Sequence, residues 1–238
     1  YGKVLKVDPS NPRWEDRDRV VLSKGHAGPA WYAALAETGF FDRDMLMTLN
    51  QGHTDLPSHP DRLKTPGVDM TTGSLGQGCS TAAGIAYAQR LKGTDTYTYL
   101  IVGDGELNEG QCWEAFEFIA ANRLNRCIVI IDDNKKQLDG YTKDVLNPFD
   151  ISQKMRAFGF YTQTVNGQDV EALDAAITEA KHHEDSAVAI VMDTVKGAGV
   201  PYFEQLMSNH SPKFDAPAKA AAEEAIAQFT AIIEGSEA

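Results

Sequence analysis

The run GDGELNEG at residues 103–110 combines glycines with acidic side chains at the point where an apolar segment ends. That segment, residues 97–102, carries the β-branched and aromatic residues typical of a buried parallel strand. A glycine-rich turn between a strand and a helix offers free backbone N–H groups to an anion. The carboxylate of Asp104 would then lie at the carboxyl edge of the sheet, where open α/β folds bind their ligands.

A second polar residue, Asn134, follows the next apolar run, residues 127–132, and 28 residues separate it from Gly105. If the two runs are neighbouring strands, Asp104 and Asn134 reach the same edge. A carboxylate and an amide oxygen, completed by a backbone carbonyl and phosphate oxygens, suit a hard cation such as Mg²⁺ or Ca²⁺. An alternative remains open, because a lone GDG is often only a turn and Asn or Asp after a strand commonly forms one.

A second glycine-rich run, TTGSLGQG at residues 71–78, precedes the small residues of 80–88. Glycine lets the backbone approach a ligand without a Cβ in the way, and the amino end of a helix offers free N–H groups. The other interpretation is a helix start that packs tightly on a sheet. By itself this run does not distinguish the two.

Alternating helical and strand-like patterns predict an α/β fold with a parallel sheet flanked by helices. We expect one domain over residues 1–215 and a helical tail over residues 216–238. A long loop over residues 50–72 is typical of a functional or mobile segment. The expected helices cover 28–39, 77–92, 109–123 and 169–183, and the expected strands cover 97–102, 127–132, 160–165 and 187–193.

Composition restricts the class of function. A chain of 238 residues that is 42% hydrophobic can bury a sizeable core. A net charge of −12 without a basic stripe argues against a nucleic-acid partner. We recognise neither a membrane-spanning apolar run nor a signal peptide. The three cysteines have neither metal-ligand spacing nor an even count, which indicates reduced thiols and a cytoplasmic location.

The interval from GDG to Asn134 resembles the signature of thiamine diphosphate enzymes. Three further segments resemble the amino-terminal half of transketolases and follow one another in the order usual for that family. The resemblance covers nearly the whole chain up to about Phe214 and implies the thiamine diphosphate-binding fold. The segments are DRDRVVLSKGHAGPAWYAALAETG at 16–39, TPGVDMTTGSLGQGCSTAAGIAYA at 65–88 and DTVKGAGVPYFEQLMSNH at 193–210.

The resemblance implies a role for most of these residues in cofactor binding. Residues 73–75 would contact the aminopyrimidine and thiazolium side of thiamine diphosphate, and Leu138 would pack against its rings. Glu109 would lie at a dimer interface and help to relay protons between cofactors, although an acidic group at a helix start can also simply stabilise the helix. The implied cofactor-binding residues are Gly73, Ser74, Leu75, Gly103, Asp104, Gly105, Glu109, Asn134 and Leu138.

The resemblance also implies a site for a divalent ion, Mg²⁺ or Ca²⁺, that neutralises the diphosphate. Asp104, Asn134 and the main-chain carbonyl of Lys136 would hold it. Relatives usually carry an apolar residue where this chain has Lys136. That difference matters little to the metal if only the carbonyl is used.

Three histidines match family positions near the reaction centre, namely His26, His59 and His210. Imidazoles titrate near neutrality, so these residues could move protons on sugar hydroxyls and stabilise alkoxides. Ser211 replaces the glycine that usually follows the last of them. His53 lies in what looks like an extra local turn, and we assign it no chemistry.

The implied reaction is transfer of a two-carbon ketol unit from a ketose phosphate to an aldose phosphate, as in pentose phosphate metabolism. Two further domains of full-length transketolases, and an early segment with a GHPGG histidine, are not found in this sequence. One of those domains supplies the glutamate that activates the aminopyrimidine. We therefore expect the amino-terminal subunit of a split transketolase, active only with a C-terminal partner subunit in a dimer of heterodimers, that is, a heterotetramer.

Two other interpretations stay open. The chain could belong to another thiamine diphosphate enzyme, resembling a deoxyxylulose-phosphate synthase or a 2-oxoacid dehydrogenase component. It could also be a non-catalytic protein that binds the cofactor and serves in assembly. The run TTGSLGQG and the element LSKGHA fit transketolases better than the other enzymes.

Overall fold

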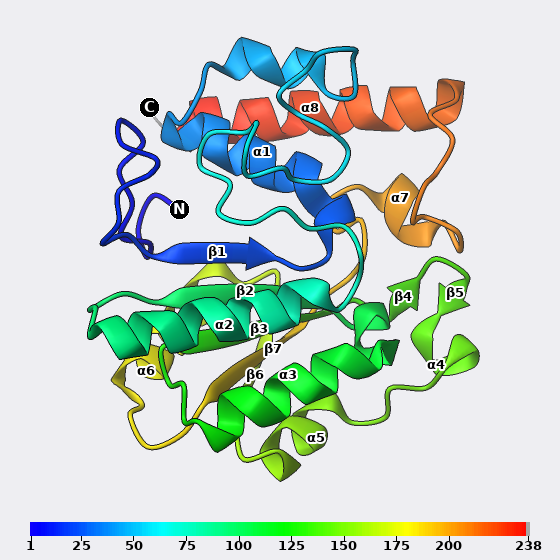
Figure 1. Ribbon diagram of the computed structural model, residues 1–238. Helices are drawn as coiled ribbons and strands as arrows, with labels where there is room; N and C mark the ends of the chain where they lie inside the picture. Colours follow the sequence, from blue (N-terminus) through cyan, green and yellow to red (C-terminus); the bar gives the residue numbers. More distant parts are fainter. Residues whose placement is uncertain (237–238) are drawn as a thin grey trace.

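A five-stranded parallel sheet forms the centre of the computed structural model, which describes residues 1–236 (Figure 1). The strand order is β1-β2-β3-β7-β6, and every neighbouring pair is parallel. The predicted α/β class is therefore confirmed. The strands are β1 (Arg19–Leu22), β2 (Thr98–Gly103), β3 (Cys127–Asp133), β6 (Tyr161–Asn166) and β7 (Val188–Asp193).

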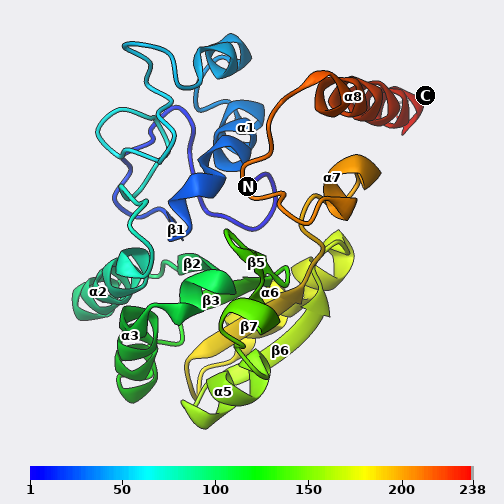
Figure 2. The same cartoon turned by 90° about the vertical axis from the view of Figure 1, so that its right-hand side faces the viewer.

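Helices cover both faces of this sheet (Figure 2). One face packs against α2 (Gln77–Lys92), α3 (Gly110–Ala121) and α5 (Ile151–Ala157), and the other against α1 (Gly28–Thr38) and α6 (Val170–His182). The remaining elements are short apart from the last. They are η1 (Gly25–Ala27), η2 (Arg43–Thr48), η3 (Gly105–Asn108), β4 (Lys136–Gln137), β5 (Gly140–Tyr141), α4 (Thr142–Val145), α7 (Pro201–Gln205) and α8 (Ala216–Ser236).

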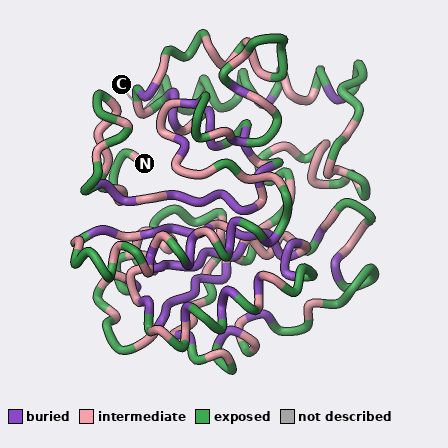
Figure 3. Tube along the Cα trace, in the orientation of Figure 1, coloured by how far each residue is buried: buried purple, intermediate pink, exposed green. Residues whose placement is uncertain are grey.

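Alternate residues of each strand enter opposite layers, because successive side chains of a strand point to opposite faces. In β3, Val129 and Ile131 join the core under α2 and α3, whereas Ile128 and Ile130 join the core under α1 and α6. Burial is concentrated along these strands (Figure 3). Two covered faces explain why the strands are nearly continuous apolar runs.

The expected helices and strands agree with the observed ones apart from small shifts at their ends. The shorter elements were not predicted, namely β1, β4, β5, α4, α5, α7 and the three 3₁₀ turns. With two to seven residues each, they are too short to show a clear periodicity. The helix expected from residue 109 begins at Gly110, because the 3₁₀ turn η3 comes before it. The loop over residues 50–72 contains neither helix nor strand, as predicted.

The terminal helix α8 lies at the same end of the molecule as α1, beyond β1, in both views (Figures 1 and 2). Ala218 and Ala225 are buried, while Ile226 and Ile232 are exposed. The predicted tail ends at residue 238, and its last two residues lie outside the described part. A domain boundary at residue 215 stays a prediction. Within residues 1–236, no helix is long and apolar enough to cross a membrane.

Candidate active site

A cavity of about 720 Å³ lies at the carboxyl edge of the sheet, where parallel strands deliver the residues that follow them. Lys24 comes after β1, Asp104 after β2, Asn134 after β3 and Lys196 after β7. All four line the cavity. Ten predicted site residues line it: His26, Leu75, Gly103, Asp104, Gly105, Glu109, Asn134, Lys136, Leu138 and His210.

Three predicted site residues, His59, Gly73 and Ser74, are not among the residues that line the cavity. His59 and Gly73 lie beside the turn that carries His26. A Cβ on Gly73 would meet Cγ of His59 at 2.9 Å, and a Cβ on Gly25 would meet the backbone nitrogen of Gly73 at 2.8 Å. The two chain segments therefore approach closely enough that only glycine fits at either position.

Asp104 is almost completely buried, with 1% of its surface exposed. Its Oδ1 accepts the Gly105 N–H at 2.8 Å, and its Oδ2 accepts the Lys135 N–H at 2.7 Å. Burial raises the pKa of Asp104 to about 6, against the opposing effect of these two bonds. A cation beside the carboxylate would favour its ionised form.

The main-chain N–H of Lys135 donates to the Asp104 carboxylate. Because Asn134 directly precedes Lys135, it lies next to Asp104. Its Oδ1 accepts the Lys136 N–H at 3.1 Å, and its Nδ2 donates to Oδ2 of Asp132 at 3.0 Å. A carboxylate, an amide oxygen and the carbonyl of Lys136 are hard oxygen donors of the kind that Mg²⁺ and Ca²⁺ prefer. The chemistry of this donor set fits a divalent cation.

Two ammonium groups reach the same cavity from different strands of the sheet. Nζ of Lys24 pairs with Asp132, whose carboxylate also accepts the Thr194 hydroxyl. Although burial opposes ionisation of Asp132, the charge of Lys24 holds its pKa below the usual value. Nζ of Lys196 lies 3.0 Å from Nδ1 of His210, and burial followed by the charge of Lys24 lowers the pKa of Lys196. Together the ammonium groups offer counter-charges for a phosphate group.

The structure brings two of the three predicted histidines together. The rings of His26 and His210 have centroids 4.8 Å apart. Burial, followed by the charges of His210 and Lys24, lowers the pKa of His26 to about 4. Burial, followed by the charge of Lys196, also lowers the pKa of His210. Both imidazoles are therefore neutral at pH 7, the form that accepts a proton.

Glu106 holds the two glycine-rich turns together, a role that the sequence did not predict. Its buried carboxylate accepts the Gly76 N–H at 2.8 Å and the Gly103 N–H at 3.2 Å, and it also accepts the Ser23 hydroxyl. Burial raises the pKa of this carboxyl, while the three donors oppose that effect. The only sequence signal for this role was the place of Glu106 in the GDGE run. Its partners Ser23 and Gly76 are 83 and 30 residues away, and sequence spacing does not reveal such contacts.

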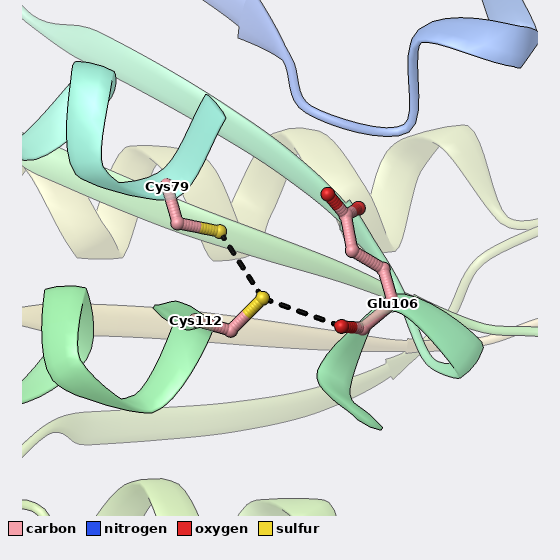
Figure 4. A group of neighbouring side chains, drawn as sticks. All are labelled: Cys79, Glu106 and Cys112. Atoms are coloured by element: carbon pink, nitrogen blue, oxygen red, sulfur yellow. Dashed lines mark hydrogen bonds between the residues drawn. The ribbon is translucent and has the colours of Figure 1, made fainter. Parts of the chain in front are cut away.

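Two buried thiols, Cys79 and Cys112, lie beside Glu106 (Figure 4). Their Sγ atoms are 3.6 Å apart, and Sγ of Cys112 is 3.3 Å from the main-chain oxygen of Glu106. The side-chain atoms are close enough together to hold a metal ion. However, the Glu106 carboxylate is already bound by three donors. We therefore assign the group to the packing of α2 against α3.

Glu109 and Leu138 lie at the rim of the cavity and are exposed. Glu109 is the N-cap residue of α3, and its Cβ would be 3.0 Å from a Cβ placed on Gly76. Leu138 is 63% exposed. The predicted proton relay through Glu109 and the ring contact of Leu138 stay predictions.

Residues 1–228 match the family described as transketolase, thiamine diphosphate binding domain. The chain belongs to the transketolase family. The 6-deoxy-6-sulfo-D-fructose transketolase subunit SqwG of Clostridium sp. is 45% identical over 214 residues, which are 90% of this chain and 78% of that protein. An apulose-4-phosphate transketolase subunit of Actinobacillus succinogenes is 38% identical over 208 residues, which are 86% of this chain and 74% of that protein.

Solved transketolases share the fold of this chain. The Leishmania mexicana enzyme gives a TM-score of 0.80 at 33% identity, and the match covers 99% of this chain and 40% of that one. The Campylobacter jejuni enzyme gives a TM-score of 0.81 at 32% identity, covering 93% and 36%. The chain is thus a transketolase subunit that corresponds to the amino-terminal, thiamine diphosphate-binding part of longer transketolases. This confirms the predicted family, fold and type of subunit.

Proposed function

We propose that this transketolase subunit binds thiamine diphosphate and a divalent cation, Mg²⁺ or Ca²⁺, at the carboxyl edge of the sheet. With a partner subunit it would transfer a two-carbon ketol unit from a ketose phosphate to an aldose phosphate. The observation that carries the proposal is the meeting of Asp104, Asn134 and Lys136 with two ammonium groups in one cavity. These oxygen donors would hold the cation, whose positive charge would offset the negative charge of the diphosphate.

The proposed roles of the chain's own residues follow from their places in the cavity. When bound, thiamine diphosphate would supply a nucleophilic carbon and an electron sink for cleavage of a carbon–carbon bond. Lys24 and Lys196 would neutralise diphosphate charge, and Leu75 would contact the rings. Gly73 and Ser74 do not line the cavity but directly precede Leu75, and they would position Leu75 for that contact.

The histidines would exchange protons with the sugar. His26 and His210 are neutral near pH 7 and face each other at the cavity wall, so either could accept a proton from a substrate hydroxyl. His59 lies against Gly73. It would reach the substrate only from the edge of the site, and we propose the more peripheral role for it.

A C-terminal partner subunit would complete the site with the pyrimidine-binding domain. This proposal is supported by the subunit names of the two relatives and by the 40% or less of the solved transketolases that the chain covers. The exposed rim residues Glu109 and Leu138 would contact partner chains in a dimer of heterodimers. We place the assembly in the cytoplasm, a location supported by three buried free cysteines.

Calorimetry of the purified chain tests cofactor binding. Thiamine diphosphate should bind in the presence of Mg²⁺ and bind much more weakly when the metal is removed by a chelator. Two-carbon transfer should appear only after the partner subunit is added. Robust turnover by the chain alone would contradict the need for a partner, and metal-independent affinity would contradict the cation site.

A comparison of donor substrates would identify the class of donor that the enzyme uses. The names of the two relatives specify a sulfonated ketose and a phosphorylated ketose. Initial rates of the completed enzyme with 6-deoxy-6-sulfo-D-fructose, xylulose 5-phosphate and pyruvate would separate the possibilities. A ketose should be the preferred donor, and a preference for pyruvate would instead indicate a synthase or dehydrogenase component.

A further inference from the structure

Lys136 stands where the family resemblance implies an apolar residue, and only 9% of its surface is exposed. Its Nζ donates to the main-chain oxygen of Glu204 at 3.0 Å and to that of Leu206 at 2.9 Å. It also lies 5.6 Å from the centre of the Tyr141 ring. The ammonium group therefore binds neutral acceptors that lie 68 and 70 residues away in sequence.

These acceptors lie at the end of α7, where the last carbonyls of a helix lack partners within the helix. A lysine side chain can satisfy such carbonyls. Its methylene stem can pack where an apolar side chain would otherwise lie, with the ammonium reaching beyond it. This explains how lysine fits a position where the family resemblance implies an apolar residue, and what its charge adds.

The bridge joins two sides of the cavity. Lys136 begins β4, shortly after the predicted cation ligand Asn134, whereas α7 belongs to the segment over residues 194–210. That segment carries Lys196 and His210 into the cavity. Figure 1 shows α7 and the β4–β5 hairpin on the same side of the molecule. No other described side chain of the hairpin donates to a carbonyl of α7.

The segment itself is tied together by Asn209. Its Nδ2 donates to the main-chain oxygen of Phe203 at 2.9 Å and to that of Lys196 at 3.1 Å. Holding the end of α7 therefore also holds the turn that carries Lys196 and the chain that leads to His210. The hydrogen bonds from Lys136 to α7 therefore also restrain Lys196 and His210 in the cavity.

We propose that Lys136 is a positioning residue whose ammonium holds the 194–210 segment against the β4–β5 hairpin, so that Lys196 and His210 face Asp104 and Asn134 before a ligand arrives. Ordering these groups in advance would lower the cost of binding. The identity of the ligand rests on the proposed function. The hydrogen bonds from Lys136 to α7 do not depend on that function.

Hydrogen exchange of the cofactor-free chain tests the bridge directly. Lys136→Met removes the donors but keeps a similar side-chain length and the backbone carbonyl. The amides of Val200, Phe203 and Glu204, which are bonded within the segment, should exchange about tenfold faster or more, as expected for the loss of two charge-assisted bonds. Lys136→Arg should restore most of the protection, because a guanidinium can also donate to two carbonyls.

Lys143→Met is the matched control. Lys143 is exposed, and its Nζ lies 5.8 Å from the centre of the same Tyr141 ring. This variant removes an equal charge beside that ring without touching α7, so its exchange should match that of the unmodified chain. If Lys136→Met does not fold, Lys136→Gln, which keeps a shorter donor, should show intermediate exchange. Unchanged exchange in every Lys136 variant that folds would overturn the proposal.

Calorimetry with thiamine diphosphate and Mg²⁺ separates positioning from direct ligand contact. We expect about tenfold weaker binding by Lys136→Met, with recovery in Lys136→Arg. Weaker binding without faster exchange would mean that the ammonium acts on the ligand itself, and would overturn the positioning role. If the unmodified chain does not bind the cofactor, the proposed function fails, yet the exchange comparison still decides whether the bridge exists.

Discussion

The turn after β2 and the segment after β7 bring charged groups to the same cavity, but different interactions hold them in place. In the turn, Asp104 and Glu106 are buried and accept main-chain N–H groups from neighbouring strands and loops. Every residue of the 194–210 segment is exposed or only half-buried. Within residues 1–236, the side chains of Lys136 and Asn209 donate to its carbonyls.

Because of this difference, we expect the two regions to have separate roles. A carboxylate fixed by the sheet can hold a cation in a constant place, because moving it would break buried bonds. A half-exposed segment held by a few side-chain bonds opens at a lower free-energy cost than a buried turn. We therefore expect damage to the first region to abolish binding or folding, and damage to the second to loosen the site locally.

Asp104→Asn should give the largest effect. It removes the charge from the proposed cation site, so affinity for thiamine diphosphate with Mg²⁺ should fall about 100-fold or more, beyond the range for residues that only support a ligand. Calorimetry measures this loss, and Asp144→Asn, at an exposed position of α4, is the control. An Asn side chain presents only one oxygen to the two N–H donors of Asp104, so the variant should lose about 1–3 kcal/mol of stability, and urea denaturation checks that it stays folded. Equal affinity in both variants would remove the cation assignment.

Glu106→Gln should weaken the fold rather than the chemistry. An amide can present only one oxygen to three donors, so the free energy of unfolding should fall by about 2 kcal/mol. Urea denaturation at pH 7 measures this change. The control is Glu117→Gln on the exposed face of α3, which should change stability by less than about 0.5 kcal/mol. A similarly small change in Glu106→Gln would show that the glycine-rich turns do not depend on its carboxylate.

Asn209→Ala should loosen only the second region. Loss of two side-chain bonds to Lys196 and Phe203 should speed hydrogen exchange in the segment several-fold. The global free energy of unfolding should change by less than about 1 kcal/mol, because the segment contributes little to either core. Met207→Ala, at an exposed position of the same segment, should leave exchange unchanged. Exchange that rises evenly through the whole chain would contradict the contrast between the two regions.

The same contrast explains what the sequence could predict. Asp104 and Asn134 each follow an apolar run, so a local pattern placed both at one edge of the sheet. The bond from Ser23 to Glu106 spans 83 residues, and the bonds from Lys136 to α7 span 68 and 70. A local sequence pattern cannot predict such contacts. The edge strand β1 was not predicted for a different reason, because four residues are too few to show the two-residue period of a strand.

The chain positions of His26 and His210 were predicted, but their contact depends on how the 194–210 segment lies against the turn after β1, which carries His26. The smallest effect, and the most direct probe of that contact, is the titration of His26. Its pKa of about 4 lies below the ordinary value near 6.5 because burial and the neighbouring charges disfavour the imidazolium. Between these two pH values the unfolded chain binds more protons than the folded chain. This group therefore lowers stability as pH falls from about 6.5 to 4, and has no effect on its pH dependence above that window.

His210→Asn removes the ring packed against His26 and should move the midpoint of the His26 titration upward, toward 6.5. The C2 proton resonance in NMR measures the midpoint, and His53→Gln, in an exposed turn, should leave it unchanged. Lys136→Met should give a smaller upward shift, because a loosened segment would spend less time over His26. A midpoint that stays near 4 in His210→Asn would mean that burial and the charge of Lys24 set the protonation of His26, and that the second region does not tune it.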